Sequence, residues 1–457
     1  MKILFVAHYY LPGHQAGTEL YTRALVRKFK KEGHQVWVFT SEDRPSPGFE
    51  LKEEEYEQVR IFRLYHSGAY DFKSSYSRED FDQIFGEILD RIQPEIIHFQ
   101  HLFRLSIGFV QQAKKRKIPS LLTLADYWLI CPAIIMLKPG QEICLGPEQG
   151  NQCARCAHAF SGFYPAQASA QPSLFWKGVE LAISYLHKIK RQLPPHLVAR
   201  LREVFGKKSK EEQKLALVKE RWQEMKKMVD ELSLVISPSR FLKDMMINCQ
   251  MLPPDKIIYS DYGFETDSFP KPISPNQEAL PQTLKIGFIG TLVHHKGVHL
   301  LIQAMSLIPG KNLELKIFGE EKDFPGYVHW LKKLGKKDKR IKWLGKIDHD
   351  QIYQALKSID LLVVPSIWYE NSPLTIHEAF LANRPVIASN LGGTKELLEK
   401  GGGITFESGN PEHLAKKIQE LIKNPEKLEK LKETIIKVKT IEENYQELLN
   451  IYQTILS

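Results

Sequence analysis

The stretch IWYENSPLTIHEAFLANRPVIASNLGGTKE, residues 367–396, decides the fold. It follows a short apolar run at 360–364 and contains a second apolar run at 385–388. Between these runs we expect a helix with Ser372 as its N-cap and Pro373 at its first position, where the missing N–H costs nothing. A buried strand, a helix and a further buried strand form the repeating unit of a parallel α/β sheet.

The same alternation extends in both directions from this stretch. Short apolar runs predict strands at 2–7, 35–40, 59–64, 95–99, 119–124, 232–237, 256–261, 285–289, 313–318, 341–344, 360–364, 385–388 and 404–406. A proline-rich stretch at 269–282 divides them into two series. The predicted fold class is therefore α/β, with two doubly wound, Rossmann-like domains that face a cleft at the carboxyl ends of their strands.

The predicted domains span residues 1–268 and 283–437, and an amphipathic C-terminal helix follows within 438–457. The strand pattern breaks at about 138–230, where the sequence is first rich in Cys, Pro and Gly and then helical and basic. We interpret this part as an insertion in the first domain.

Composition excludes several classes of protein. Of the 457 residues, 26% are charged and 43% are hydrophobic, which is ordinary for a globular protein and rules out disorder, collagen and a coiled-coil rod as the main state. No apolar run is long enough for a membrane-spanning helix. The N-terminal sequence MKILFVAHYYLPG resembles a first strand rather than a signal peptide, so we expect a cytoplasmic protein.

Most of the net charge of +9 falls in one segment. Residues 177–228 hold 14 Lys and Arg against 6 Asp and Glu, and aromatic Phe175, Trp176 and Trp222 lie in or beside them. Such a run is commonly the solvated face of helices. The functional alternative is contact with anionic lipid headgroups or with another acidic partner.

Two glutamates flank the expected helix start in the opening stretch. A helix N-terminus at the end of a parallel strand offers unpaired N–H groups to a phosphate. Glu370 lies just before that terminus and Glu378 eight residues later, so one carboxylate can face a group beyond the phosphate and the other a sugar hydroxyl. The structural alternative is a pair of exposed glutamates, one of them favourably placed at a helix N-terminus.

This region closely resembles glycosyltransferase family 4 over most of residues 284–410. The residues that carry the resemblance are Pro365-Ser366, Trp368, Glu370, Asn371-Ser372-Pro373, Glu378, Pro385 to Ser389 and Gly392-Gly393. Members are retaining enzymes of the two-domain GT-B fold that use nucleotide-diphosphate sugars. The resemblance implies that Glu370 lies beside the transferred sugar as a catalytic residue and that Glu378 binds the ribose. It also implies that the backbone amides of Ser372, Leu374 and Thr375 hold the diphosphate.

A second segment supports this resemblance. Gly290-Thr291-Leu292, followed by Lys296-Gly297, is similar to the family's Gly-Arg-Leu-x3-Lys-Gly loop, which implies a catalytic Lys296 opposite the diphosphate. Thr291 stands where many members have arginine, so His294, His295 or a more distant basic residue would supply part of the missing charge. Three further donor-binding positions are implied, namely Gly319, Lys346 and Ile347.

The N-terminal half is expected to hold the acceptor. The loop HYYLPGHQAGTE, residues 8–19, follows the first strand, and the resemblance implies that Gly17 lies against the donor phosphates. The acceptor-side residues implied or proposed here are His8, Glu19, His101 and Asp126. For His8, Glu19 and His101 individually, an ordinary structural role is an equal alternative. Many members have histidine at the position of Ala125, and this departure affects how the transferred sugar is held.

Four cysteines lie close together in the sequence, in the pattern C-x12-C-x8-C-x2-C: Cys131, Cys144, Cys153 and Cys156. Four thiolates match a closed structural zinc site, which has no open position and hence no catalytic role. Reduced or disulfide-linked thiols and an iron–sulfur cluster are the alternatives. A subset of the same family has a similar cysteine-bearing insertion.

The function implied by the resemblance is retaining transfer of a hexosyl or related group from a nucleotide-diphosphate sugar to a saccharide or lipid-linked acceptor. The leaving diphosphate would take the acceptor's proton, so no cofactor and no catalytic metal are expected. The product would belong to a cell-surface polysaccharide or glycolipid, with residues 177–228 against the inner face of the membrane. The alternatives are a sugar-nucleotide epimerase or phosphorylase, and a basic protein that only binds nucleic acid or membrane; we expect no nucleic-acid partner.

Overall fold

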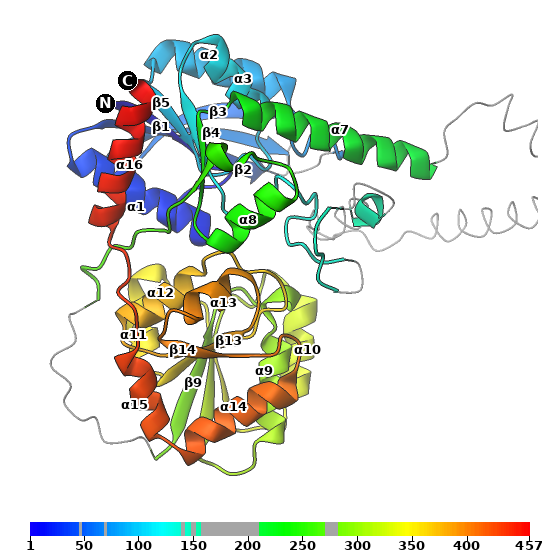
Figure 1. Cartoon of the computed structure of the whole chain (residues 1–457), viewed down its shortest axis with the longest axis vertical. Coiled ribbons are helices and arrows are strands. Elements are labelled where there is room, and N and C mark those ends of the chain that lie inside the picture. Colours follow the sequence, from blue (N-terminus) through cyan, green and yellow to red (C-terminus); the bar gives the residue numbers. More distant parts are fainter. Residues whose placement is uncertain (45–47, 68–70, 139–141, 148–151, 157–209, 270–281) are drawn as a thin grey trace, which may run out of the picture.

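The computed structural model describes residues 1–44, 48–67, 71–138, 142–147, 152–156, 210–269 and 282–457. Most of the proline-rich stretch expected as a linker and the first part of the basic segment, up to residue 209, therefore lie outside the described residues. The described chain forms two α/β units, one above the other (Figure 1). Each unit is built on one sheet, as the sequence predicts.

The first unit contains a sheet with the strand order β3-β4-β2-β1-β5-β6-β7-β8, parallel except for β3. Its strands are β1 Lys2–Val6, β2 Gln35–Arg44, β3 Phe49–Tyr56, β4 Val59–Ser67, β5 Ile96–Phe99, β6 Ser120–Thr123, β7 Leu234–Ser237 and β8 Ile257–Tyr259. Its helices are α1 Gly17–Lys31, α2 Glu79–Ile92, α3 Gly108–Lys115, α7 Lys210–Glu231 and α8 Arg240–Asn248, with the short η1 Pro254–Lys256.

The second unit contains an all-parallel sheet with the order β11-β10-β9-β12-β13-β14. Its strands are β9 Leu284–Ile289, β10 Leu313–Phe318, β11 Ile341–Gly345, β12 Leu361–Val364, β13 Val386–Ser389 and β14 Gly403–Phe406. Its helices are α9 Val298–Leu307, α10 Pro325–Gly335, α11 Ile352–Lys357, α12 Leu374–Leu381, α13 Gly392–Leu398, α14 Pro411–Lys423 and α15 Glu426–Glu433, with the short turns η2 His294–Lys296 and η3 His349–Gln351.

The order of strands reverses direction between β1 and β5 in the first sheet and between β9 and β12 in the second. Open α/β sheets bind ligands outside the carboxyl ends of their strands at such switch points, because the two flanking loops diverge there. The loops after β9 and β12 carry Lys296 and Glu370, the two residues expected to be catalytic.

The strands are apolar because helices cover both faces of each sheet. In β1, Ile3 and Phe5 point into one hydrophobic core, whereas Leu4 and Val6 point into the core on the opposite face, and all four are fully buried. The core that contains Ile3 continues through Tyr262 and Phe264 to the second unit. The two units are thus joined by apolar packing as well as by the chain.

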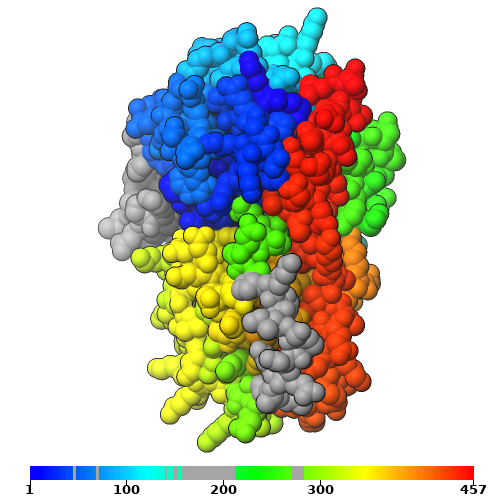
Figure 2. Space-filling model, turned by 90° about the vertical axis from the view of Figure 1, so that its left-hand side faces the viewer, coloured from blue at the N-terminus to red at the C-terminus, as the bar shows by residue number. Residues whose placement is uncertain are grey.

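Helix α16, Ile441–Leu456, leaves the second unit and packs along α1 of the first (Figure 1). In Figure 2 this C-terminal segment, in red, runs along the molecule from the lower unit to the upper one. A capping box between Thr440 and Glu443 begins the helix. The hydroxyl of Tyr21 donates to Asn444 at 2.9 Å, which fixes the helix to the first unit.

One strand was not predicted, and one helix start was predicted at the wrong residue. The sequence FELKEEEY, which we left without a predicted strand, forms β3, an antiparallel edge strand whose many charged side chains hide the strand signal but protect an exposed edge. Helix α12 begins one residue later than expected, so Pro373 is the N-cap and not the first helical residue. Ser372 does not cap the helix, because its hydroxyl bonds to Asp261 and His377 instead.

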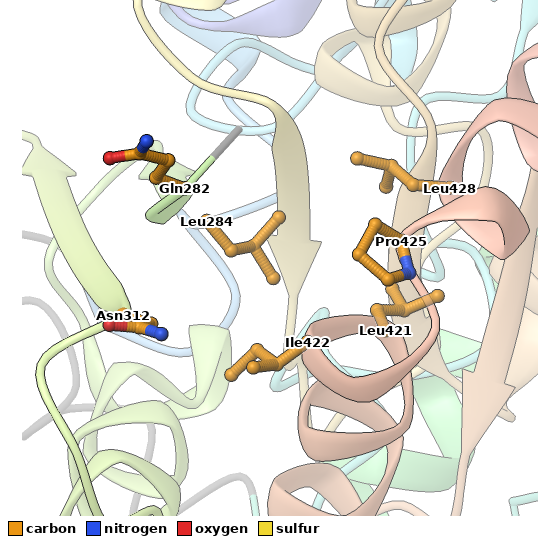
Figure 3. Close-up of a pocket in the computed structure, with 7 residues that line it drawn as sticks. All are labelled: Gln282, Leu284, Asn312, Leu421, Ile422, Pro425 and Leu428. Atoms are coloured by element: carbon orange, nitrogen blue, oxygen red, sulfur yellow. The ribbon is translucent and has the colours of Figure 1, made fainter. Parts of the chain in front are cut away.

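None of the helices in the described part of the chain combines the length and the apolar character needed to cross a membrane. A small cavity of about 40 Å³ lies at the base of the second sheet, beside the first residue of β9 (Figure 3). Its lining residues are Gln282, Leu284, Asn312, Leu421, Ile422, Pro425 and Leu428. This cavity is far too small for a nucleotide. It lies where β9 begins, whereas the loops that carry the candidate site follow the ends of β9 and β12.

Candidate functional site

An ion pair joins the loops after β9 and β12. Lys296 Nζ lies 2.8 Å from Glu370 Oε1. Ser366 Oγ donates to the same oxygen at 2.6 Å, and Trp368 Nε1 donates to it at 2.9 Å. Lys296 also lies over the ring of Trp368, 5.2 Å from its centre. The two residues expected to be catalytic are therefore direct neighbours, although they are 74 residues apart in the sequence.

The carboxylate of Glu370 is buried but ionised. Burial by itself raises the pKa of this carboxyl, but the charge of Lys296 and the hydrogen bonds from Lys296, Ser366 and Trp368 outweigh it and lower the pKa below its ordinary value. All three donors bind Oε1, and no hydrogen bond among the described residues involves Oε2. The hydrogen bonds to Oε1 thus fix the carboxylate, and Oε2 remains available to accept a hydrogen bond from a ligand.

Glycines let the backbone of the site pack closely. Gly290 has φ +152°. A Cβ on Gly319 would overlap the carbonyl oxygen of Gly290, so these two predicted donor-binding glycines meet at the ends of β9 and β10. Behind Glu370, the N–H of Gly393 donates to the Glu370 carbonyl at 2.8 Å, and a Cβ on Gly393 would overlap the carbonyl oxygen of Asn371. The loop that carries Glu370 is thus supported by direct backbone contact.

The second glutamate, Glu378, is buried in α12, and its Oε1 accepts from His349 Nε2 at 2.8 Å. Lys346 and Ile347 lie just before η3, the turn that begins at His349; Lys346 is exposed, and Ile347 is partly buried. Sequence reasoning missed His349. The only sequence signal for His349 was that it lies two residues after Ile347, a predicted donor-binding residue.

Several predicted residues lie where the two units touch. A Cβ on Gly17 would lie 3.4 Å from Leu374 Cδ1, so the first turn of α1 contacts the first turn of α12. Ser372 Oγ donates to Asp261 Oδ1 at 2.7 Å, and Ser239 Oγ donates to Asn371 Oδ1 at 2.5 Å. Thr375 is partly exposed in the same helix turn. The partners Asp261 and Ser239 were not among the predicted site residues.

The acceptor-side residues form one cluster at the end of β1. His8 Nε2 lies 3.7 Å from Glu19 Oε1, and the rings of His8 and His101 are 4.7 Å apart. His101 Nε2 donates to Asp126 at 3.0 Å, whereas its Nδ1 accepts from the N–H of Phe103 at 2.9 Å. His101 therefore has both ring nitrogens satisfied by the protein. In contrast, His8 Nδ1 and Glu19 Oε2 are buried atoms that have no hydrogen-bond partner among the described residues.

The cationic side of the site depends on Lys296. Thr291, in the place of the family's arginine, is exposed. Burial and, to a smaller extent, the charge of the neighbouring Lys296 together lower the pKa of His295 to about 3, so this ring is neutral. His294, whose pKa is also lowered by burial, packs beside His299. The expectation that these two histidines replace the missing charge is therefore not supported.

The cysteines do not form a ligand set in this structure. Cys131, Cys153 and Cys156 are buried, and Cys144 Sγ donates to the Gly146 carbonyl at 3.1 Å. Within the described ranges, no three His, Cys, Asp or Glu side chains are placed to hold a metal ion together. In the absence of a metal, burial raises the pKa of the Cys131 thiol to about 12. The described side chains thus do not support the predicted zinc site or its iron–sulfur alternative, which stay predictions, and no chemical step below uses a metal.

The arrangement can hold a phosphorylated, hydroxyl-rich ligand. The first N–H groups of α12 have no partner within the helix and carry partial positive charge, and Lys296 pairs with Glu370 in the loop that leads into this helix. Two buried carboxylates, Glu370 and Glu378, lie at the two ends of the same segment, each with one oxygen fixed by a protein donor. Phosphate oxygens can accept hydrogen bonds from the helix N–H groups. Sugar hydroxyls can donate to the free oxygens of the two carboxylates.

The chain has measurable similarity to known proteins. It is 31% identical over 154 residues to spore coat protein SA of Bacillus subtilis, which covers 32% of this chain and 41% of that protein. It is 30% identical over 193 residues to the uncharacterized glycosyltransferase MJ1607 of Methanocaldococcus jannaschii, covering 40% and 48%. The chain thus spans less than half the length of these curated relatives. A protein of the cps region of Klebsiella pneumoniae matches 87% of both chains at 21% identity.

Solved structures share the whole fold at low identity. Sucrose-phosphate synthase of Thermosynechococcus elongatus superposes with a TM-score of 0.66 at 16% identity, over 99% of this chain and 98% of that one. Anabaena Alr3699/HepE, in complex with UDP and glucose, gives 0.62 at 16% identity, over 99% and 100%.

Two family models match the sequence itself. The model described as glycosyl transferases group 1 matches residues 271–438, and the one described as glycosyltransferase family 4 matches residues 16–133. Together they cover more than half of the chain and include both units of the fold. The chain therefore belongs to the group 1 glycosyltransferases of family 4, and its two Rossmann-like domains form the GT-B fold.

Proposed function

We propose that this protein transfers a hexosyl or related group, with retention, from a nucleotide-diphosphate sugar to a saccharide or lipid-linked acceptor. The observation that carries the proposal is the Lys296–Glu370 pair at the switch point of the second sheet, 2.8 Å apart and beside the start of α12. Lys296 and the helix N–H groups would stabilise the charge that develops on the leaving diphosphate. Glu370 Oε2 would accept hydrogen bonds from the transferred sugar and stabilise its oxocarbenium character.

The transfer step needs no strong protein base. The bond between the anomeric carbon and the diphosphate oxygen breaks, the acceptor oxygen forms a bond on the same face, and its proton passes to the leaving phosphate oxygen. The state of Glu370 supports this route, because a carboxyl with a lowered pKa is a weak base and a poor proton donor at neutral pH. Glu370 would therefore act by charge and hydrogen bonding. We expect no cofactor requirement.

The acceptor would bind on the first domain, beside His8 and Glu19. Their buried atoms Nδ1 and Oε2 have no hydrogen-bond partner in the described part of the chain, and hydroxyl groups of a saccharide would satisfy them. A peripheral position at the inner face of the cell membrane, with residues 177–228 against anionic lipid, would bring a lipid-linked acceptor to this site. Synthesis of a cell-surface polysaccharide or glycolipid would fit both features. Equal flotation with neutral and anionic liposomes would contradict the membrane contact.

A donor screen tests the proposed reaction. The purified protein is incubated with UDP-, GDP-, ADP- and TDP-sugars and candidate acceptors, and products are identified by mass spectrometry and anomeric NMR. We expect wild type to release one nucleoside diphosphate and form an α-linked product from an α-linked donor, and Glu370→Ala and Lys296→Ala to lose this activity. Lys427→Ala, in an exposed ion pair with Glu420, is the matched control and should react as wild type.

The outcomes separate the alternatives. An epimerised sugar nucleotide without transfer would favour a sugar-nucleotide enzyme of another kind. No turnover and no nucleotide binding by folded wild type would contradict the proposal and favour a protein that only binds an acidic partner. Inversion at the anomeric carbon would contradict retention alone.

A further inference from the structure

The carboxylate of Glu378 is held by one neighbouring side chain. Glu378 is only 4% exposed, and its Oε1 accepts from His349 Nε2 at 2.8 Å. No hydrogen bond among the described residues involves its Oε2. This carboxylate has one oxygen fixed and the other available, as in Glu370, but among the described residues its single donor is a histidine, whereas Glu370 accepts from three side chains.

His349 belongs to a short, well-defined turn. It is the first residue of η3, which follows β11 and the segment Gly345-Lys346-Ile347. The N–H of Gln351 donates to the Asp348 carbonyl at 2.9 Å, and the next residue donates to the carbonyl of His349 itself. The backbone at His349 is therefore fixed on both sides, and its side chain, which is about one third exposed, reaches α12 from a rigid base.

Charges on three elements act on the His349 ring. Burial lowers its pKa, but the hydrogen bond and charge of Glu378 in α12, helped by Asp350 in its own turn, raise the pKa on balance above the ordinary value. Arg23, from α1 of the first domain, opposes this effect. The imidazolium is thus favoured below neutral pH, where it forms a true ion pair with Glu378. After deprotonation the neutral ring can still donate through Nε2.

We propose that His349 is a positioning residue that sets the orientation of Glu378 for the ribose of a nucleoside diphosphate. This inference rests on the proposed function and on the family resemblance, which implies that Glu378 binds the ribose of the donor. With Oε1 held by His349, Oε2 is left to accept from a ribose hydroxyl. Without the imidazole, the buried carboxylate would lose the hydrogen bond that fixes its rotamer, and the hydroxyl would gain little by binding to it.

Discrimination between ribose and deoxyribose tests the inference directly. Binding of UDP, GDP and ADP, each beside its 2′-deoxy counterpart, is measured by calorimetry between pH 6 and 8.5. The ratio of the two dissociation constants is the readout, because titration of the diphosphate affects both ligands equally and cancels. The variants are His349→Ala, His349→Gln and, as a control on the exposed face of α10, His329→Ala.

We expect wild type to bind the ribose form roughly tenfold tighter, the size of one hydrogen bond to a charged group. That ratio should fall as pH rises through the raised pKa of His349. His349→Ala should bring the ratio close to one at every pH. His349→Gln keeps a neutral donor, so it should retain a reduced ratio that no longer depends on pH. His329→Ala should behave as wild type.

The failures are distinguishable. If no nucleotide binds to wild type that is folded by circular dichroism, the proposed function fails and the inference fails with it. If a nucleotide binds but His349→Ala keeps the wild-type ratio and pH dependence, the inference alone is overturned. Wild type that binds both sugars equally also overturns the inference alone.

Discussion

Removal of the Lys296 charge should destabilise the second domain in a way that depends on pH. In Lys296→Met, the carboxylate of Glu370 keeps its hydrogen bonds from Ser366 and Trp368 but loses the cation 2.8 Å from Oε1. Methionine preserves most of the aliphatic contact with Trp368, so the change isolates the charge.

The size of the effect follows from burial. Breaking a buried ion pair by removing one partner costs about 3–5 kcal/mol, because an uncompensated charge is left inside the protein. Glu370 is almost fully buried, but Lys296 is 28% exposed and two hydrogen bonds remain, so the lower end applies. We expect a loss of about 3 kcal/mol in the free energy of unfolding at pH 7. For a domain of this size that lowers the melting temperature by about 6–12 °C.

The pH dependence has opposite signs in the two proteins. In wild type the folded-state pKa of Glu370 lies below the ordinary value of 4.5, so its contribution is present above that value and lost as pH falls through the folded pKa. In Lys296→Met we expect burial to outweigh the two remaining hydrogen bonds, so that the folded pKa of Glu370 lies above 4.5 and stability is lost as pH rises through it. The difference between the two proteins should therefore be largest at pH 7 and should shrink as pH approaches 4.

Urea unfolding at a series of pH values, followed by circular dichroism and tryptophan fluorescence, measures both effects. Glu370→Gln combined with Lys296→Met should recover part of the lost stability, since no buried charge remains. Lys427→Met, which breaks the exposed pair with Glu420, is the control and should leave the unfolding midpoint unchanged. A Lys296→Met protein as stable as wild type at pH 7, or one whose deficit is the same at pH 4, would refute the reasoning.

Two further changes test the support of the site and of the first domain. Gly393→Ala would push a Cβ into the Asn371 carbonyl oxygen, so we expect a loss of several degrees in melting temperature and of nucleotide binding, whereas Gly326→Ala, with open space at the exposed N-terminus of α10, should be neutral. His98, buried against Tyr452 of α16, has its pKa lowered by burial to about 3, so it stabilises the fold above pH 6.5 and this contribution is lost as pH falls toward 3. His98→Gln, which does not titrate, should show a shallower loss of unfolding midpoint over that range, and equal slopes would contradict this account.

The fold was largely predictable because its signals are local. Short apolar runs separated by helical patterns identified the parallel strands, for example 313–318, which matches β10 residue for residue. The exception, β3, lacks such a run, because an exposed edge strand can be built largely from charged residues. The helix start at residues 372–373 was misplaced by one position, because a serine hydroxyl can bond to a distant partner as readily as to its own helix.

The candidate site was predictable only in part. Glu370 and Lys296 could be proposed from motif and spacing, but the partner of each side chain comes from elsewhere in the fold. His349 is 29 residues from Glu378 in the sequence, and Ser239 is 132 residues from Asn371. Such pairs follow from how the strands are ordered in space. The spacing of apolar residues along the sequence does not reveal which strands are neighbours in the sheet.

The segment after β12 combines functions that are separate in most loops. Glu370 carries the carboxylate of the site, while the next two residues, Asn371 and Ser372, bond to Ser239 and Asp261 of the first domain. A movement of one domain relative to the other must therefore displace the residues that adjoin Glu370. Closure of the domains and alignment of the carboxylate are coupled through a single run of backbone. The backbone contact between this run and Gly393 limits how far it can move independently of α13.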